Sequence, residues 1–442
     1  QLRSRNFILC YLGADSYGFV HRTFLEYFCA CEFVERFGKR GLEGGLTLEE
    51  LKTEVFGKHL QDESWHEVLR LISGMIDTSF AGEIIEYLMA LDGKAQKFIN
   101  LFLAAKCLSD VRNRNAIATA SALLLDRLKT LTNRYDLFVE EAISTIATIW
   151  QDDPNTLPWL KNLVQSDVNE FSRAKALEEL VKGWKNDSEI LPILKQLALS
   201  DGDNTGEVNR IAIKLLVKGW KNDPNTLLWL KELAQSNSDR FIRHQAMQQL
   251  VKAWKDEPDI LPWLKNRAQS DVDPCIRQLA VNELADAFKD SPDMPNFLAN
   301  CAINECLDAI KHKYFWPMNP RQAALAAITK QYPEHPQTLP LLRNRVENDP
   351  DDKVREFAMQ ELAKIGKDEP GMFEFFCHRA LNDPFERQDE EEDNLRQLAL
   401  EIIIKQYPDH PQTIPLLRDR AENDPDDRLR QFANKKLAEL EV

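Results

Sequence analysis

The feature that most constrains the fold is a repeat that is clearest between residues 150 and 288. Each unit has a turn of the Asp-Pro type, a short apolar helix, a second turn, and another helix that ends in an aromatic residue. The aromatic positions Trp150, Trp184, Trp220 and Trp254 follow one another at nearly equal steps. A fixed period of this length predicts a stacked array of helix pairs in place of one globular core.

The second helix of each unit carries the most regular pattern. Counted from an arginine at slot zero, alanine occupies slot three, leucine or isoleucine slot seven, and in most units an aromatic residue slot eleven. These offsets lie on one side of an α-helix, so they predict its buried stripe. After Trp184 the pattern shifts, with Asn209 at slot zero and Arg210 one residue later. The slot-zero arginines are Arg173, Arg243, Arg277, Arg321, Arg355, Arg396 and Arg430.

The spacing Asp-x-x-x-x-x-Arg-x-x-Ala-x-x-x-Leu, as in Asp271 to Leu284 and Asp349 to Leu362, resembles the HEAT repeat. The resemblance covers roughly residues 145–442. We therefore predict an all-α fold, with an α-solenoid of HEAT-like repeats over residues 151–442. The slot-zero arginine follows an aspartate by six residues. We interpret it as a structural tie between the inter-helix turn and the neighbouring repeat, and a row of anion ligands is the alternative.

The chain before Gln151 lacks clear repeat identity. Residues 7–20 predict two short apolar strands around a Gly-Ala-Asp-Ser turn, and Phe24, Tyr27 and Phe28 predict an amphipathic helix behind them. Residues 1–45 are expected to be the end of a winged-helix-like α/β region or a small cap. Residues 46–150 are expected to be a helical bridging domain or degenerate repeats. Thr47 and Glu50 predict a capping box, and helices are expected over residues 65–76, 81–91, 95–111, 116–131 and 137–150.

Two segments carry a second resemblance. The run Phe-Val-His-Arg-Thr-Phe-Leu-Glu-Tyr-Phe-Cys-Ala, from Phe19 to Ala30, is similar to the segment that closes the winged-helix region of NACHT-type STAND NTPases. The stretch from Trp65 to Met75 resembles the helix that follows it in that family. In the family the histidine of the first motif reaches the β-phosphate of ADP. The resemblance therefore implies that His21 is a nucleotide contact, and a capping or packing role is the alternative.

The chain has no Gly-x-x-x-x-Gly-Lys-Ser/Thr motif, which a phosphate-binding loop requires. We therefore expect no enzymatic activity from this segment. By the resemblance, an NTPase domain that binds ADP or ATP with magnesium would lie N-terminal to Gln1. The absence of an initiating methionine agrees with a fragment of a longer protein.

Composition limits the partners. Lys and Arg number 56 against 71 Asp and Glu, a net charge of −15, which disfavours nucleic acid and anionic membrane surfaces. No apolar run in the sequence is long enough to span a bilayer. The eight cysteines have no disulfide-type spacing, so we expect a cytoplasmic protein. A zinc cluster of Cys301, Cys306 and His312 lacks a fourth ligand, and core packing is favoured.

Slot nine of the second helix is a candidate partner-binding row on the expected concave face. A repeated surface lysine, favoured by the helix dipole, is the other interpretation. The series Trp159, Trp229 and Trp263 is interpreted as core in preference to a stacking platform for bases, and Lys161 on a first helix is expected to face solvent. Loops are predicted at residues 311–318 and 389–393. The slot-nine lysines are Lys182, Lys218, Lys252, Lys330, Lys364 and Lys405.

These features favour the partner-sensing region of a NACHT-type signal-transduction NTPase, which the resemblance associates with defence or programmed-death signalling. The alternative is a free-standing HEAT scaffold or a lyase-type chaperone. A protein or other large, partly acidic macromolecule fits the expected concave face better than a small metabolite does.

Overall fold

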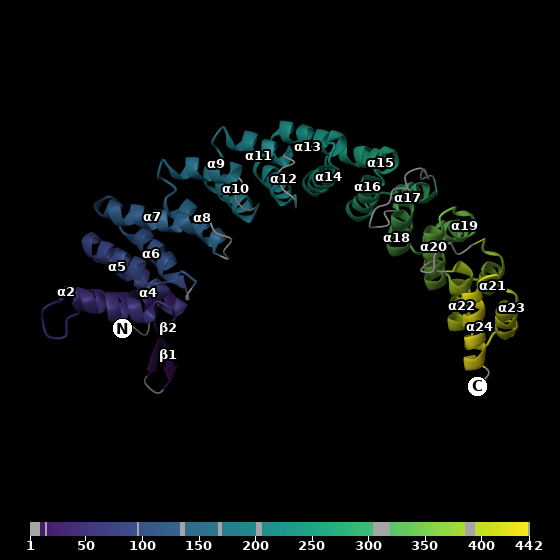
Figure 1. The fold of residues 1–442 in the computed structure, drawn as a ribbon, viewed down its shortest axis with the longest axis horizontal. Helices are drawn as coiled ribbons and strands as arrows, with labels where there is room; N and C mark the ends of the chain where they lie inside the picture. Colours follow the sequence, from purple (N-terminus) through teal and green to yellow (C-terminus); the bar gives the residue numbers. More distant parts are fainter. Residues whose placement is uncertain are drawn as a thin grey trace. The chain divides into compact units, whose positions relative to one another are not determined.

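The computed structural model of the 442-residue chain describes residues 9–13, 16–94, 97–132, 138–166, 170–199, 206–303, 319–384 and 394–440. These residues are mainly helical (Figure 1), and the chain divides into two compact units, residues 1–221 and residues 222–442. The loops predicted at residues 311–318 and 389–393 lie outside the described residues.

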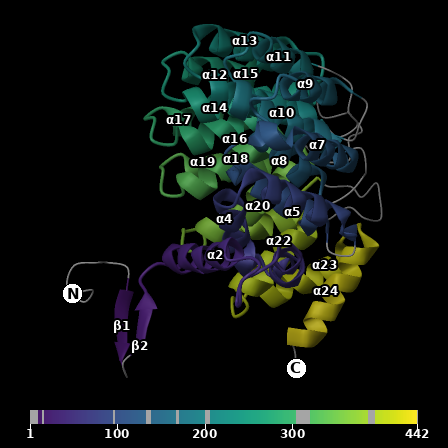
Figure 2. The same ribbon diagram turned by 90° about the vertical axis from the view of Figure 1, so that its left-hand side faces the viewer.

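Unit 1 begins with the predicted hairpin. Strand β1 (Leu9–Gly13) pairs antiparallel with β2 (Ser16–Phe19), and helix α2 (Arg22–Gly38) follows almost at once. Figure 2 shows the hairpin projecting beside the start of α2. The rings of Phe19 and Phe28 stack with their centroids 5.7 Å apart, which joins the second strand to the helix. The hairpin and the amphipathic helix predicted for residues 7–30 are therefore confirmed for the described residues.

The rest of unit 1 is helical. The predicted capping box is present at the start of α3, where the Glu50 N–H donates to the Thr47 hydroxyl and the Glu50 carboxylate accepts from the Thr47 N–H. A π-helical segment that the sequence did not predict continues from α3. The elements are α3 (Leu48–Glu50), the π-helical η1 (Leu51–Gly57), the 3-10 helix η2 (Glu63–Trp65), α4 (His66–Met75), α5 (Thr78–Ala90), α6 (Ile99–Asp110), the 3-10 helix η4 (Arg114–Ile117), α7 (Ala118–Thr132), α8 (Val139–Ile149), α9 (Thr156–Gln165), α10 (Glu170–Trp184), α11 (Ile190–Leu199) and α12 (Glu207–Trp220).

Helices of unit 1 pack in successive pairs. Helix α5 packs on α6, α7 on α8, α9 on α10 and α11 on α12, while α4, α6, α8, α10 and α12 form a continuous row of neighbours. The packing thus extends back through residues 78–149, where the sequence showed no repeat. Two asparagines, one in α12 and one in α6, make the same kind of hydrogen bond to the preceding helix. Asn209 Nδ2 donates to the Leu197 carbonyl at 2.8 Å, and Asn100 Nδ2 donates to the Leu88 carbonyl at 2.9 Å, each twelve residues back.

Unit 2 has the same organisation. The first helices pack on the second helices, and the second helices α14, α16, α18, α20, α22 and α24 contact one another in succession. The helices are α13 (Pro224–Ser236), α14 (Arg240–Trp254), α15 (Ile260–Ser270), α16 (Pro274–Ala287), α17 (Met294–Ile303), α18 (Pro320–Gln331), α19 (Thr338–Asn348), α20 (Asp352–Ile365), α21 (Met372–Asn382), α22 (Leu395–Gln406), α23 (Thr413–Asn423) and α24 (Asp427–Leu440).

The predicted stripe is the core of the stack. Slot-three alanines such as Ala280 and slot-seven residues such as Leu250 and Leu284 are fully buried. Leu437, the slot-seven residue of α24, is only half-buried because no further described helix covers it. Proline at the first turn starts helices as predicted, for example Pro262 in α15. The all-α stack of repeated helix pairs is therefore confirmed.

Candidate functional site

His21 lies between β2 and α2, at the N-cap of the helix. Its backbone is extended, its side chain is exposed, and that side chain makes no capping hydrogen bond. The next residue, Arg22, anchors the junction, because its Nε donates to Glu26 at 2.6 Å and its Nη2 donates to the Ser64 carbonyl at 3.0 Å. The junction is thus fastened to the segment before α4, while the imidazole remains open to solvent.

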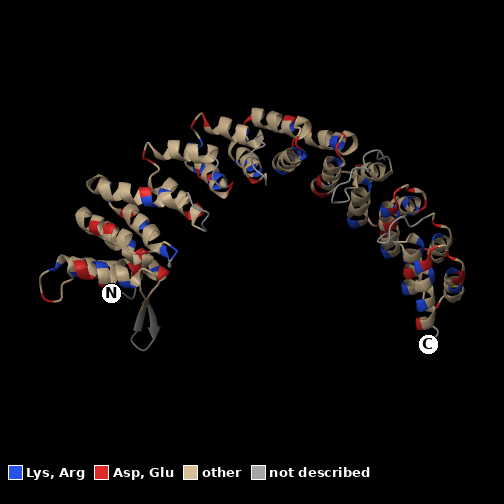
Figure 3. Cartoon of the chain, viewed as in Figure 1, with Lys and Arg blue, Asp and Glu red and all other residues tan. Residues whose placement is uncertain are grey.

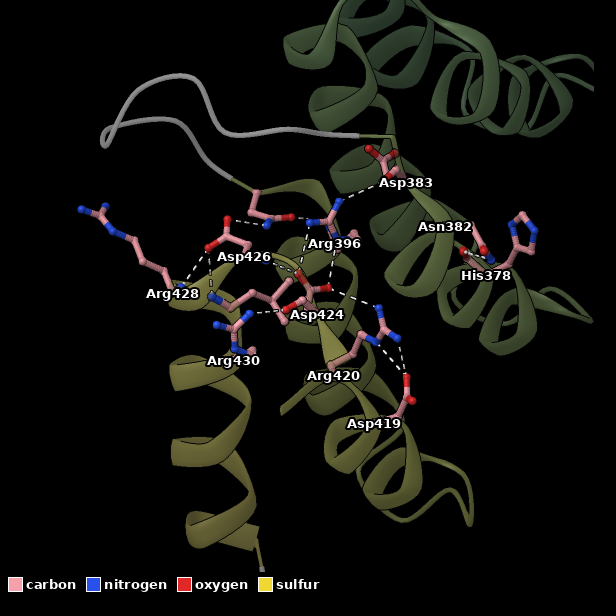
Figure 4. Close-up of polar contacts among 12 residues, drawn as sticks. His378, Asn382, Asp383, Arg396, Asp419, Arg420, Asp424, Asp426, Arg428 and Arg430 are labelled. Carbon is pink, nitrogen blue, oxygen red and sulfur yellow. Dashed lines mark hydrogen bonds and ion pairs between the residues drawn. The ribbon is translucent and has the colours of Figure 1, made fainter. Parts of the chain in front are cut away.

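A buried network of arginine and aspartate side chains joins neighbouring repeats in unit 2. In Figure 4, the Asp424 carboxylate lies between Arg396 of α22 and Arg420 of α23. Arg396 donates from Nε to Oδ2 at 3.0 Å and from Nη2 to Oδ1 at 3.1 Å, and Arg420 Nη1 lies 3.3 Å from Oδ2. Arg396 Nη1 also donates to the Asp383 carbonyl at 3.0 Å. One guanidinium therefore ties two successive inter-helix turns together.

The same tie recurs along the unit. Arg355 Nη1 donates at 2.9 Å to the carbonyl of Asp349, six residues earlier, and its Nε forms an ion pair with Asp383 at 3.7 Å. Arg321 of α18 pairs with Asp349 in the same way, at 3.3 Å, whereas Arg243 of α14 pairs at 2.9 Å with Asp273, the N-cap of α16.

Energetics favour a structural role for these arginines. A buried ion is stable only when opposite charge and hydrogen bonds surround it. Burial raises the pKa of the Asp349 carboxyl, and the Asp351 N–H, Arg321 and Arg345 act in the opposite direction. Arg321 itself has only 2% of its surface exposed. The structural interpretation of the slot-zero arginine is therefore confirmed for these repeats. Sequence reasoning missed the second arginine beside Asp349 and beside Asp424, although Arg-x-x-x-Asp recurs in Arg345 to Asp349 and Arg420 to Asp424.

All six slot-nine lysines are exposed, and each lies in the last turn of a second helix. Lys182 and Lys218 belong to unit 1, and the other four belong to unit 2. Two of the six are paired within their own helix: Lys182 Nζ lies 3.3 Å from Glu179, and Lys364 Nζ lies 2.5 Å from Glu361. Among the residues that the structure describes, the other four make no ion pair. These four are Lys218, Lys252, Lys330 and Lys405.

Helices of unit 2 carry both basic and acidic residues (Figure 3). Slots one and five hold amides and carboxylates on the same exposed side. Gln397 Nε2 donates to Glu401 at 2.9 Å, and Gln360 Nε2 donates to Glu356 at 3.2 Å. Helix-internal hydrogen bonds of this kind orient the carboxylates, which keep their negative charge, so this side of unit 2 presents both ammonium groups and carboxylates to a partner.

Two open grooves lie in unit 2. One, of about 370 Å³, separates α22 from α24 and is lined by Lys405. The other, of about 570 Å³, lies between α17 and α19 and is lined by amides such as Asn296 and Asn300. Described residues line both sides of the second groove, and Ile303 in its lining is the last described residue before residues 304–318.

Aromatic residues on the first helices serve packing. Trp159, Trp229 and Trp263 are half-buried, and Trp159 packs on the core of unit 1 with Lys129 Nζ 5.3 Å from its ring centroid. Their interpretation as core residues holds in part, because one face of each stays accessible. Lys161 does not point freely into solvent as expected. Its ammonium binds Asp187 at 2.9 Å and Glu189 at 2.6 Å, because the next repeat places both carboxylates beside α9.

Of the three residues considered for a zinc cluster, Cys306 and His312 lie outside the described residues, and Cys301 is buried in α17. Within the described ranges, no group of three or more His, Cys, Asp or Glu side chains is arranged to hold a metal ion. None of the helices in those ranges combines the length and the apolar character that crossing a membrane requires.

Comparison with known proteins adds no family assignment. No protein-family model matches the chain, and no curated protein matches its sequence. The arrangement of side chains offers an exposed imidazole at a strand-to-helix junction, exposed lysines on the second helices, and a groove lined by one of them, Lys405.

Proposed function

We propose that this chain is the partner-sensing region of a NACHT-type signal-transduction NTPase, with its helix pairs of the HEAT class and its nucleotide-binding domain N-terminal to Gln1. The order of elements carries the proposal. A strand hairpin leads into α2 with His21 at its N-cap, α4 follows, and stacked helix pairs occupy the rest of the described chain. That order agrees with the two segments, Phe19 to Ala30 and Trp65 to Met75, that resemble the family.

In this proposal the second helices bind a macromolecular trigger, and the junction at His21 responds to it. The exposed slot-nine lysines support the first part, because rim charges speed the association of a partner with opposite charge. The exposed His21 side chain supports the second part, because an imidazole can donate a hydrogen bond to a phosphate oxygen of ADP held by the upstream domain. The setting is cytoplasmic signalling, with defence as its biological context.

The test uses the full-length parent protein. We expect His21→Ala to weaken ADP retention by about tenfold to a hundredfold, since one charge-assisted hydrogen bond to phosphate is lost. Bound nucleotide is measured after purification, and basal signalling should rise in parallel. His335→Ala, at an inter-helix turn of unit 2, is the matched control and should retain ADP.

Equal ADP occupancy in the parent and in the His21→Ala variant would remove the nucleotide role. A reading frame upstream of Gln1 without a Gly-x-x-x-x-Gly-Lys-Ser/Thr motif would favour a free-standing scaffold instead.

A further inference from the structure

The groove between α22 and α24 is lined by apolar and charged side chains. Ile404 and Phe432 are half-buried, and Glu401, Lys405 and Lys436 complete the lining. Its volume of about 370 Å³ is enough for one or two side chains of a partner, and it is too open to enclose a small metabolite.

Two ammonium groups, of Lys405 and Lys436, line this groove against the one carboxylate of Glu401. Lys436 Nζ lies 2.6 Å from Glu439 of the same helix, and Glu401 accepts a hydrogen bond from Gln397 at 2.9 Å. Lys405 is exposed and makes no ion pair with any residue that the structure describes. The Lys405 ammonium, which has no charged partner among the described residues, therefore lies beside an apolar surface.

The neighbouring repeats extend the apolar side of this surface. Slot two of α20, α22 and α24 holds Phe357, Leu398 and Phe432, all half-buried. The same slot of α14 holds Gln245, which is polar. Apolar side chains beside slot-nine lysines are thus a feature of the C-terminal part of unit 2, where α20 and α22 also carry Lys364 and Lys405.

From this arrangement we infer that the groove between α22 and α24 anchors an apolar side chain of a protein partner, in a segment where a carboxylate residue is adjacent. The inference rests on the proposed binding role of the second helices and specifies the partner's chemistry. Contact with Ile404 and Phe432 removes the partner's apolar side chain from water. Lys405 binds the adjacent carboxylate through a charge-assisted hydrogen bond, and a basic segment is repelled.

The test measures fluorescence anisotropy of labelled peptides with the full chain. The probe is acetyl-Gly-Ser-Glu-Leu-Asp-Leu-Ser-Gly-amide; one comparison peptide replaces both acidic residues with lysine, and another replaces both leucines with serine. We expect the probe alone to bind. Phe432→Ala and Lys405→Glu should each weaken binding by about tenfold, and Phe432→Leu should restore most of it.

Matched controls separate this groove from exposed lysines in general. Lys255→Glu after α14 and Lys435→Glu on α24, both outside the groove, should leave peptide affinity unchanged, and circular dichroism should show equal helicity in all variants. No binding of the probe, or equal loss from Lys255→Glu and Lys405→Glu, would overturn the groove assignment while leaving the His21 test intact. A self-association of the chain that Phe432→Ala abolishes would also overturn it, because a second copy would then be the occupant.

Discussion

At the scale of single residues, the slot-zero arginine joins each repeat to the next. Its position six residues after an aspartate lets it bond the turn of its own repeat, and its length lets it reach the carboxylate of the following one. Arg355 does both, with Asp349 and with Asp383. Asn209, at the same slot, bonds the preceding helix through the Leu197 carbonyl. Register between repeats is therefore specified partly by buried charge and partly by apolar packing.

Removing one of these arginines should lower the stability of the fold. We expect Arg396→Met to lower the free energy of unfolding by about 3 kcal/mol, because Asp424 stays buried with only Arg420 as its charged partner. Urea denaturation followed by circular dichroism measures the change.

The comparison for Arg396→Met is Lys39→Ala, which removes an exposed pair with Glu35 and should leave stability nearly unchanged. Similar urea midpoints for Arg396→Met and the parent chain would contradict a stabilising role for the buried network.

At the scale of helices, the repeat depends on an apolar stripe that touches only neighbouring helices. Leu250 lies in the middle of α14 and is fully buried. Replacing it with alanine should cost about 2 to 5 kcal/mol through lost burial and the cavity that remains. Hydrogen exchange measures this loss helix by helix, and it should be largest in α13 to α16, because helix pairs couple mainly to their neighbours. Unchanged exchange in α14 would show that the assigned register is wrong.

Much of the helix arrangement could be predicted from the sequence. The Ala and Leu slots indicated which face of each second helix is buried, and prolines such as Pro262 marked helix starts. The sequence left open whether α5 to α8 form degenerate repeats or a bridging domain, because Asn100 stands where later repeats carry arginine. The π-helical segment Leu51–Gly57 has no pattern of its own, and the pairing of Lys161 depends on carboxylates of the next repeat.

The candidate site was only partly accessible to sequence reasoning. Periodicity correctly put the slot-nine lysines on an exposed side, since nine residues after the arginine falls outside the buried stripe. Periodicity could not show that Lys182 and Lys364 form ion pairs with Glu179 and Glu361. It also could not show that a groove lies between α22 and α24. That groove forms from side chains on two helices that are separated in the chain by α23, as Lys405 and Phe432 illustrate, and no local pattern reports it.

At the scale of the whole chain, each of the two compact units has its second helices packed in one row. A row of this kind lets many weak contacts act on one partner, and no closed pocket is needed. We propose that the second helices, and not the first helices, present the recognition surface.

Photo-crosslinking in cells that produce the full-length parent shows which helices face the partner. The photoreactive residue p-benzoylphenylalanine is placed either at Gln360 on α20 or at the exposed Glu347 on α19. We expect a discrete protein adduct from Gln360 that disappears when Lys330 and Lys364 are changed to glutamate, and no such adduct from Glu347. An adduct from Glu347 alone, or one from Gln360 that survives both lysine reversals, would contradict the proposal.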